Sequence, residues 1–450
     1  MTRFIPRAPA IASIDASRLA LALALATTAC SGRDDSTTGA TTDDASTTDD
    51  ASTTDDPTLD PSLEECHALP AAEVAQWIEG PRVDPTGSST PARIAEAGAR
   101  TWTLALDLLR VIDDAAHPSV AASPASMSLA LGLSYARWQT DPCGAEIRAH
   151  MHFAEEGDAL HQTFGASILE LEGASLPASD GADPVVVGLR PSIWQLDGGL
   201  IDNPVYGAVG HQVTKGSPEA LAAIREVMNC VIERQSNGLL VDFLPGDHPR
   251  ADTTSYEVNV AYLQAPWPTV MSERGELDFA AKSGTVALPA IGDSSASADY
   301  YEDDAMQAVD LELRGSRLAI LMILPDASTD LASFTAALDG DGLAGVRAQL
   351  ARRTIDLTLP KFKIDSVTLD YYEPLGFDCP LFTLRSILHG ATVELDQKGI
   401  KAAAATAAEG WESSTGPPPP EVVLTFDRPF LFFVHEQSTD FVLYSGRYAG

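Results

Sequence analysis

The sequence predicts a mixed α and β fold in one large domain. Helical periodicity dominates the first half of the chain, apolar strand-like runs dominate the second half, and the two do not alternate regularly. The 450 residues are 45% hydrophobic, which is enough to bury a sizeable core. The formal net charge of -35 argues against nucleic acid or an anionic membrane surface as a partner.

The predicted helices lie mainly before residue 240. Residues 92–112 place apolar side chains at helical spacing, which predicts a long amphipathic helix. Ser123-Pro124 opens an apolar helix that continues to Trp138, because proline suits the first turn of a helix. The segment 145–172 is rich in helix and acidic residues, and 218–233 predicts a further helix.

The predicted strands lie mainly after residue 250, and most are short, apolar and bounded by turn residues. A polar turn through Gln437-Ser438 joins the last two in a buried antiparallel hairpin. The predicted strands are 185–196, 258–263, 318–324, 354–364, 422–426, 430–434 and 441–444.

Residues 1–29 have the features of an export signal. Arginines precede a short apolar run from Leu19 to Ala26, and small residues then lead to Cys30. The small residues before Cys30 resemble a bacterial lipobox, in which the cysteine is lipidated, but Thr27 stands where leucine is usual. Lipidation of Cys30 and simple cleavage near Ala29 therefore both stay open, and either predicts an exported, extracellular or cell-surface bacterial protein.

Residues 30–60 form a predicted tether. The hexapeptide TTDDAS occurs at 41–46 and again at 47–52, and the segment is acidic without aromatic residues. Such a segment cannot bury enough apolar surface to fold, so we expect it to be disordered and the folded domain to span 61–450. No later apolar run approaches the ~20 residues that span a bilayer, so we expect membrane attachment only through the lipid anchor.

The remaining cysteines, Cys66, Cys143, Cys230 and Cys379, allow two disulfides with three possible connectivities, or free buried thiols. They form no CxxC pair, and the His150–His152 pair lacks an acidic cluster. The chain also has no GxSxG elbow, P-loop or GxGxxG beside a strand. We therefore expect no metal, no cofactor and no enzyme activity.

The segment Asp396–Pro420 is predicted as a long exposed loop whose first half can become a strand. It has a hinge glycine, Gly399, near its start, continues as small residues and ends in four prolines. With the period-two alternation of a strand, one face can enter a core and the other can stay wet. The core face is Ile400, Ala402, Ala404 and Thr406, and the wet face is Lys401, Ala403 and Ala405.

The loop and the tail together resemble a known family. Gly399 with small residues, a proline stop, Glu421-Val422 and Pro429–Phe433 resemble the reactive-centre loop and C-terminal signature of the serpins. The resemblance covers roughly residues 92–450. It also includes Ser123-Pro124-Ala125-Ser126, Asn259–Tyr262 with Trp267, His389 eight residues before Gln397, Leu318–Pro325 and Gly446-Arg447.

The resemblance implies a fold with three β-sheets, about eight or nine helices and a reactive-centre loop at about 397–420. It also implies a suicide-substrate inhibitor, in which a serine protease, or a papain-like cysteine protease, forms an acyl-enzyme and the cleaved loop inserts into the central sheet. A non-inhibitory binding or carrier protein of the same fold is the alternative. We expect a monomer. The implied hinge is Gln397, Lys398, Gly399, Ile400, Lys401, Ala402, Ala403, Ala404, Ala405 and Thr406, and the implied shutter and breach residues are Ser123, Ser126, Asn259, Trp267 and His389.

The sequence departs from the family pattern at the hinge. Gln397 replaces the usual glutamate, Ile400 replaces the usual threonine, and the loop is longer than usual. Counting forward from Gly399 places the reactive bond at Ser413-Ser414, and counting back from Pro420 places it near Gly416-Pro417. We favour Ser413-Ser414, because a proline just after the bond resists most serine proteases.

The residues near that bond indicate the class of protease. No Lys or Arg lies between Lys401 and Arg428, which disfavours a trypsin-like target. Trp411 suits a chymotrypsin-like pocket, Glu412 a glutamate-specific one and Ser413 an elastase- or subtilisin-like one. The acidic character of 145–172 disfavours a glycosaminoglycan as a partner.

Overall fold

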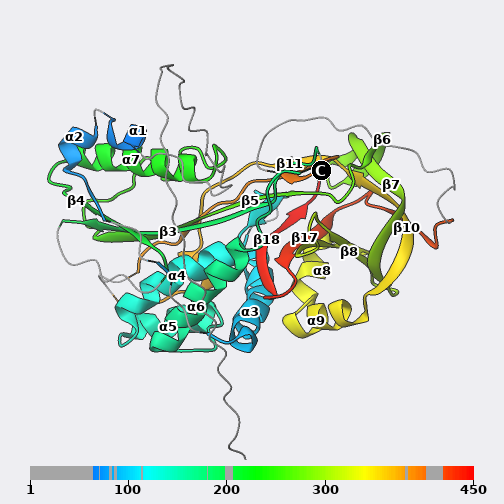
Figure 1. Ribbon diagram of the computed structural model, residues 1–450, viewed down its shortest axis with the longest axis horizontal. Coiled ribbons are helices and arrows are strands. Elements are labelled where there is room, and N and C mark those ends of the chain that lie inside the picture. Colours follow the sequence, from blue (N-terminus) through cyan, green and yellow to red (C-terminus); the bar gives the residue numbers. More distant parts are fainter. Residues whose placement is uncertain are drawn as a thin grey trace, which may run out of the picture. The chain divides into compact units, whose positions relative to one another are not determined.

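The computed structural model in Figure 1 describes residues 64–69, 71–80, 84–85, 89–112, 115–179, 181–197, 206–380, 384–401 and 419–450. They belong to one compact unit, residues 55–450. The expected mixed α and β domain with three sheets is confirmed. Within the described residues, no helix is long and apolar enough to cross a membrane.

The seven-stranded sheet has the order β1-β4-β3-β5-β15-β14-β11. β3 and β4 are parallel, whereas β5 runs antiparallel to β3 over ten residue pairs. The three-residue β15 lies between β5 and β14 and is antiparallel to both. The bounds are β1 (Ile78–Glu79), β4 (Val209–Val213), β3 (Val186–Leu196), β5 (Ser255–Pro266), β15 (Gly399–Lys401), β14 (Val393–Asp396) and β11 (Phe362–Ile364).

The nine-stranded sheet has the order β16-β10-β7-β8-β9-β17-β18-β2, with β6 paired to β7. The predicted C-terminal hairpin is β17 and β18, and β16 pairs in parallel with β10. The bounds are β16 (Val422–Thr425), β10 (Ala351–Pro360), β7 (Gly284–Glu302), β8 (Met306–Glu312), β9 (Leu318–Pro325), β17 (Phe430–Glu436), β18 (Phe441–Tyr448), β2 (Val120–Ala122) and β6 (Ser272–Ala281); the small third sheet pairs β12 (Leu369–Asp370) with β13 (Leu388–His389).

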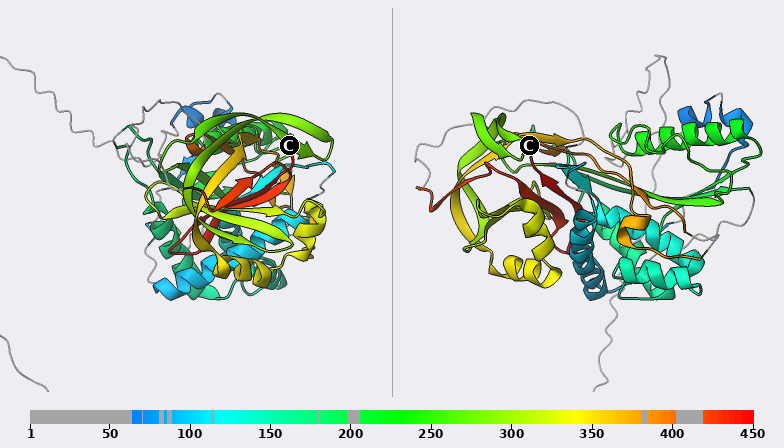
Figure 2. Two further views of the ribbon diagram at one scale, coloured as in Figure 1. Left: turned by 90° about the vertical axis from the view of Figure 1, so that its right-hand side faces the viewer. Right: turned by 180° about the vertical axis from the view of Figure 1, so that it is seen from behind.

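The helices pack on opposite faces of the seven-stranded sheet. α7 lies on one face, and α4, α5 and α6 lie on the other (Figures 1 and 2). The described helices are α3 (Pro91–Arg110), α4 (Pro124–Trp138), α5 (Pro142–His150), α6 (Gly157–Glu172), α7 (Pro218–Gln235), α8 (Leu331–Ala337) and α9 (Gly340–Gln349), with three of four residues, α1 (Glu64–His67), α2 (Ala72–Ala75) and α10 (Tyr372–Leu375).

Four helices, α3, α4, α5 and α7, begin with a shared local signal. Thr90, Ser123, Asp141 and Ser217 each accept a hydrogen bond from a backbone N–H of the first turn, and a proline follows each of them. The side-chain oxygen satisfies a donor that the helix leaves unpaired, and proline has the helical φ already. The start of α4 at Ser123-Pro124 is the one that the sequence predicts from this signal, and the structure confirms it.

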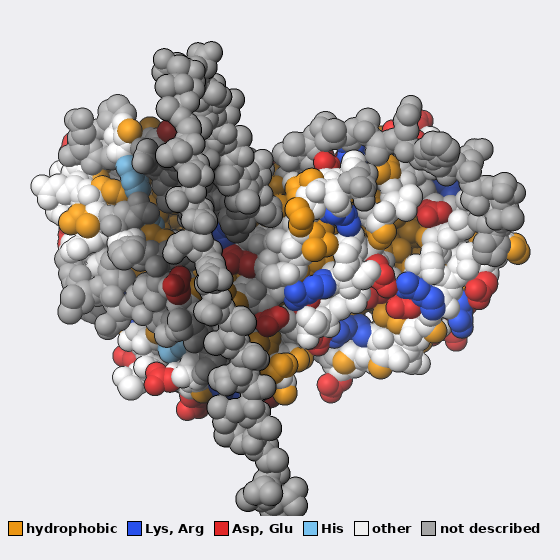
Figure 3. Space-filling view, in the orientation of Figure 1, with side chains coloured by type: hydrophobic (Ala, Val, Ile, Leu, Met, Phe, Trp, Pro, Cys, Tyr) orange, Lys and Arg blue, Asp and Glu red, His pale blue; other side chains and the backbone are white. Residues whose placement is uncertain are grey.

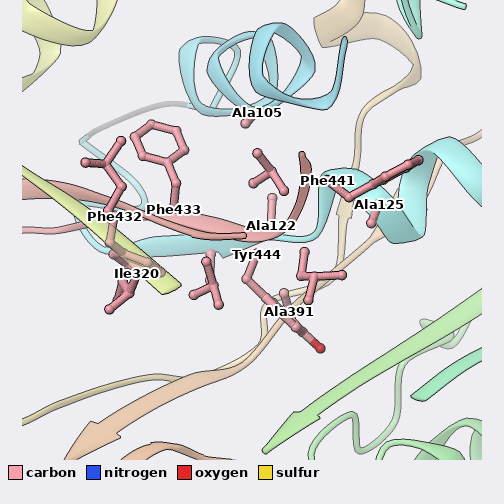
Figure 4. Packing of buried hydrophobic residues seen from close by; sticks show 14 of the residues in the cluster. Ala105, Ala122, Ala125, Ile320, Ala391, Phe432, Phe433, Phe441 and Tyr444 are labelled. Carbon is pink, nitrogen blue, oxygen red and sulfur yellow. The ribbon is translucent and has the colours of Figure 1, made fainter. Parts of the chain in front are cut away.

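The main hydrophobic core lies where α3 and α4 pack on β9, β17 and β18, whose residues are all buried. In Figure 4, Phe433 points toward α3, and Tyr444 points the other way, toward Ala391. The Tyr444 hydroxyl donates to the Ala261 carbonyl of β5 at 2.8 Å, which joins this core to the other sheet. Continuous apolar runs such as 318–324 thus reflect strands buried on both faces.

Two disulfides, Cys66–Cys230 and Cys143–Cys379, use the four cysteines of the folded domain. This connectivity is one of the three that the sequence allows, and free thiols are excluded at these positions. The first joins α1 to α7, and the second joins α5 to the segment after α10.

The charged side chains of the described surface are mixed in sign. On the face shown in Figure 3, Lys and Arg side chains lie among Asp and Glu side chains. Arg352, for example, pairs with Asp299 and Glu312, and Lys361 pairs with Glu273. Exposed pairs of this kind contribute little to stability, about 0–1 kcal/mol each.

Candidate functional site

The hinge re-enters the seven-stranded sheet through a tight turn. Asp396 ends β14, and its Oδ1 accepts the backbone N–H of Lys398 at 2.7 Å and that of Gly399 at 3.3 Å. β15 then places Ile400 opposite Leu395 on one side and Ala265 on the other. Ile400 is 4% exposed and belongs to the main core, so the predicted core face of the hinge is in place at its first residue.

Gly399 is required at this turn. Its φ is 145°, in a region that side chains other than glycine rarely adopt. A Cβ here would also collide with the backbone of Ala265 and Pro266 on β5. Gly399 is one of the predicted hinge residues, and its physical role is to let the chain approach β5 closely.

Trp267 fastens the turn from the end of β5. Its indole Nε1 donates to the Asp396 carbonyl at 3.0 Å, and its backbone N–H donates to the Lys398 carbonyl at 2.8 Å. The Met271 N–H donates to the Gln397 carbonyl, also at 2.8 Å. Gln397 and Lys398 are therefore held in place through their backbone carbonyls. Because any residue has such a carbonyl, these hydrogen bonds do not depend on whether position 397 is glutamine or the usual glutamate.

A groove lies along β5 beyond the end of β15, on the edge where β15 pairs. It has a volume of about 790 Å³ and lies between β5 and the segment 384–392. On one edge β5 pairs with β3 along most of its length; on the other, within the described residues, only Ala265 and Pro266 pair, with β15. No described strand pairs with the rest of that edge, where the Asn259 and Ala261 carbonyls instead accept hydrogen bonds from the Ser126 and Tyr444 hydroxyls. A strand edge without a partner strand can accept a further strand.

Four predicted residues meet in the wall of this groove. The Ser123 N–H donates to His389 Nε2 at 2.8 Å, and the Ser126 hydroxyl donates to the Asn259 carbonyl at 2.6 Å. The Asn259 amide donates through Nδ2 to Ser126 Oγ at 3.2 Å. Ser123 Oγ also caps α4 and donates to the Leu443 carbonyl, so the cluster joins α4, β5, β13 and β18.

Asn259 leaves one acceptor unused. Its Oδ1 has no hydrogen-bond partner among the described residues, although the side chain is buried and the residue only 9% exposed. An unpaired buried amide oxygen costs about 1–3 kcal/mol. Because Asn259 lines the groove, a donor that entered the groove could satisfy this oxygen.

His389 must be neutral to accept the Ser123 N–H. Burial lowers the pKa of His389 to about 4, since a charged imidazole would lose its solvation there. The ring also packs against Tyr371, with centroids 5.8 Å apart. The cluster is therefore intact at neutral pH and is weakened by acid.

Glu257 is a groove residue that the sequence analysis did not identify. Its side chain is 7% exposed and faces α4, from which Ser134 donates to it at 3.3 Å and Arg137 Nη1 lies 3.7 Å away. Ser255 of β5 itself also donates to it, at 3.1 Å. Burial raises the pKa of Glu257 despite these contacts. A lone charged residue in a strand normally faces solvent, so no pattern in the sequence signalled this position.

The other predicted residues are distributed as follows. Trp267 lies with the hinge, eight residues along β5 from Asn259, and not with the serine cluster. Ala402–Thr406, the reactive-bond candidates Trp411, Glu412, Ser413, Ser414 and Gly416, and Cys30 lie outside the described residues. His150 lies 3.4 Å from Glu146 and His152 2.7 Å from Asp107; within the described chain no group of three or more His, Cys, Asp or Glu could hold a metal.

Comparison with known proteins agrees with this geometry. An uncharacterized serpin-like protein of Thermococcus kodakarensis is 25% identical over 352 residues, which cover 72% of this chain and 79% of that protein. Iripin-2 of Ixodes ricinus is 24% identical and covers 79% of this chain and 93% of its own length. Serpin B3 of Homo sapiens is 26% identical over 247 residues, which are 50% of this chain and 63% of that protein.

Solved structures have the same fold. The crystal structure of a thermophilic serpin, tengpin, in the native state gives a TM-score of 0.63 at 18% identity and covers 78% of this chain and 93% of tengpin. The crystal structure of human thyroxine-binding globulin in complex with its ligand also gives a TM-score of 0.63, at 19% identity. That match covers 80% of this chain and 99% of the globulin. A sequence model of the Serpin family, described as serine protease inhibitor, matches residues 99–375 and 380–450, and the chain therefore belongs to the serpin family.

Proposed function

We propose that the protein is an exported inhibitor of serine-type endopeptidases that acts as a suicide substrate. The protease cleaves the loop and forms an acyl-enzyme, and the loop then inserts beside β5, into the groove between β5 and the segment 384–392. The observation that carries this proposal is β15: the hinge residues Gly399 and Ile400 already pair with both β5 and β14. The inhibitor itself then needs no catalytic group.

The register of β15 supports a full insertion. Ile400 pairs with Ala265 and Leu395, and continuing both ladders residue by residue brings Thr406 opposite Asn259 and His389. Thr406 carries a hydroxyl, and Asn259 Oδ1 is the unpaired acceptor at that level. On the same alternation Ala402 and Ala404 follow Ile400 into the core, and no proline interrupts residues 399–406.

The energy of insertion is large compared with the stability of a domain. About 11 residues, from Ala402 to Glu412, would gain strand hydrogen bonds at a net of about 1 kcal/mol each. The total of order 10 kcal/mol is similar to the free energy of unfolding of an ordinary domain. This energy could carry an attached protease along the sheet and distort its active site.

The target follows from the loop sequence. We propose cleavage at Ser413-Ser414, or beside Trp411, Glu412 or Gly416, by a chymotrypsin-, elastase- or subtilisin-like protease, with a papain-like cysteine protease as a further possible target. The absence of Lys and Arg from 402–427 supports a target that is not trypsin-like. We also propose that a monomer acts at the cell surface, attached through Cys30 and the acidic tether.

The test is a panel of these proteases with the full chain. An SDS-resistant complex and stoichiometric loss of protease activity are expected, and the mass of the released C-terminal peptide identifies the cleaved bond. Ala404→Arg, which would place a charge in the core, should convert the inhibitor into a substrate, whereas Lys401→Arg on the other face should inhibit normally. Cleavage of the wild type with fully active protease across the panel would contradict the proposal.

Ile400 favours one alternative, a non-inhibitory binding or carrier protein. Its branched side chain is already buried between β5 and β14, so it could hold the hinge in place instead of letting it advance. Melting before and after the loop is nicked separates the two functions. A strong rise on nicking supports insertion, and an unchanged melting temperature supports the alternative.

A further inference from the structure

We propose that residues 64–80 are an N-terminal clamp that holds α7 over the groove and so limits the rate at which the reactive loop enters the sheet. This inference rests on the proposed function, because it concerns the same insertion. The clamp consists of α1, α2 and β1, and it lies before the first residue that matches the family model, residue 99.

The C-terminal end of α7 and the segment that follows it cover the outer face of the groove. Ile232 of α7 and Leu240 pack on Val260 of β5. On the opposite wall, the Thr392 hydroxyl donates to the Leu239 carbonyl at 3.2 Å. The segment after α7 therefore reaches from one wall of the groove to the other.

An inserting strand needs the space beneath this cover. If an inserted strand continued the register of β15, Ala403 would lie opposite Tyr262 and Thr392, and Ala405 opposite Val260. These are residues that α7 and its following segment contact. The strand can pass only if this cover moves away from the sheet.

The clamp is covalently bound to α7, and its strand β1 is the edge strand of the seven-stranded sheet. Cys66 is fully buried and forms the disulfide with Cys230, in the C-terminal half of α7. β1 adds to the edge of β4, with Ile78 opposite Gln212. Two further backbone bonds fix the same segment: the Thr214 N–H donates to the Ala75 carbonyl at 3.0 Å, and the Gly80 N–H donates to the Gly210 carbonyl at 2.7 Å.

An aromatic cluster fills the space between clamp and sheet. Trp77 packs edge-on against Trp194 of β3, with ring centroids 4.8 Å apart, and contacts His211 of β4 at 5.2 Å. His211 in turn lies 4.1 Å from Trp194. Aromatic contacts of this kind add to the apolar area that the cluster buries. The clamp thus fixes α7 to the edge of the sheet that lies away from the groove, and α7 cannot rise freely.

The experiment compares rates of insertion in the full chain. The double variant Cys66→Ser with Cys230→Ser removes the covalent link, and Trp77→Ala removes the aromatic contact without touching the disulfide. Ile78→Ala is the matched control, because its side chain is 62% exposed on the same segment. Each protein is held at a series of temperatures below its melting point, and conversion to a heat-resistant form that no longer inhibits protease is followed over time.

The double variant should convert at least tenfold faster than the wild type and Trp77→Ala about threefold faster, with Ile78→Ala within twofold. A tenfold change corresponds to about 1.4 kcal/mol of barrier. Conversion of both variants at the wild-type rate, or none at any temperature below melting, would overturn the clamp. Nicking the wild-type loop is measured first: if melting does not rise, the proposed function fails, whereas a rise with unchanged variant rates rejects the clamp alone.

Discussion

In the nine-stranded sheet, β9, β17 and β18 are buried along their whole length and have a partner on each edge. In the seven-stranded sheet, β5 pairs on its groove edge through only two residues of the described chain. Both sheets contain strands of similar length. The nine-stranded sheet, called the closed sheet below, has fully paired strands at its centre. The seven-stranded sheet, called the open sheet below, has a strand edge that is largely without a partner among the described residues. Under the proposed function, the closed sheet supplies most of the stability and the open sheet receives the loop.

The two buried glutamates express the same contrast. Burial alone would raise the pKa of Glu436 at the end of β17, but hydrogen bonds from Thr439, Arg317 and Ser438 lower it overall. Glu257 on β5 has longer contacts, and burial raises its pKa. A satisfied carboxylate rigidifies the closed sheet, and a less well satisfied one lies on the strand beside which we propose that the loop inserts.

The largest expected effect is in the closed sheet. Phe432→Ala should destabilise the protein by about 3–5 kcal/mol, since the side chain is fully buried and contacts Phe362. Urea unfolding of the intact and the loop-cleaved protein measures the loss, which should be equal in the two forms. Val423→Ala, at a position 69% exposed, should cost less than about 0.5 kcal/mol. A loss confined to the intact form would mean that this sheet also changes on insertion.

The next largest effect is the loss of stability in acid that comes from His389 in the groove wall. His389 has a pKa of about 4 in the fold against 6.5 unfolded, so the unfolded chain binds more protons as the pH falls. Stability is complete above about pH 6.5 and declines by about 3 kcal/mol down to pH 4. Burial also lowers the pKa of His211, His161 and His248, which adds to the decline.

Urea titrations at several pH values of the wild type and of His389→Gln test this contribution. The variant has an amide oxygen that can accept the Ser123 N–H but does not titrate in this range. It should lose about 3 kcal/mol less than the wild type between pH 6.5 and 4. Parallel curves for the two proteins would show that the histidine is already solvated in the folded state.

A third and smaller effect should be specific to the inserted loop. Thr406→Val keeps the shape of the side chain but cannot donate to Asn259 Oδ1, so the loop-cleaved form should lose about 1–3 kcal/mol and the intact form almost nothing. Thr406→Ser keeps the hydroxyl and serves as the control. Melting of the intact and nicked proteins gives both values. An equal loss in both forms would place Thr406 in contact with the fold before cleavage, against the proposed register.

The sequence predicts the closed sheet better than the open one, for a physical reason. Runs such as 318–324 and 430–434 are apolar because both faces are buried, and this is visible without a structure. β6, β7 and β8 of the same sheet were missed, because β6 and much of β7 are exposed and none of the three is a continuous apolar run like 318–324. The disulfide pairing depends on how α1 meets α7 and α5 meets the segment after α10, which spacing along the chain does not encode.

The residues of the groove wall were predictable from the sequence only where they belong to a recognisable motif. Ser123, Ser126, Asn259 and His389 were named from their order along the chain, and the structure brings them together. The pairing of Gly399–Lys401 was not foreseen, since it depends on the Asp396 turn and on Trp267. α1, α2, β1 and Glu257 were missed too, because elements of two to four residues and a single acidic residue are too short to show a periodic signal.

The smallest expected effect has the opposite sign and bears directly on the two glutamates. Because the folded-state pKa of Glu257 is raised, its charged form is disfavoured in the fold, and the resulting loss of stability appears as the pH rises through that pKa. Glu257→Gln should therefore stabilise the protein at pH 7 by roughly 1 kcal/mol and do nothing at pH 4. Glu436→Gln should destabilise at pH 7, because it leaves Arg317 and Thr439 without their carboxylate. Paired urea titrations of the two variants decide the matter: if Glu257→Gln also destabilises at pH 7, the Arg137 contact outweighs burial, and the open sheet is as well satisfied as the closed one.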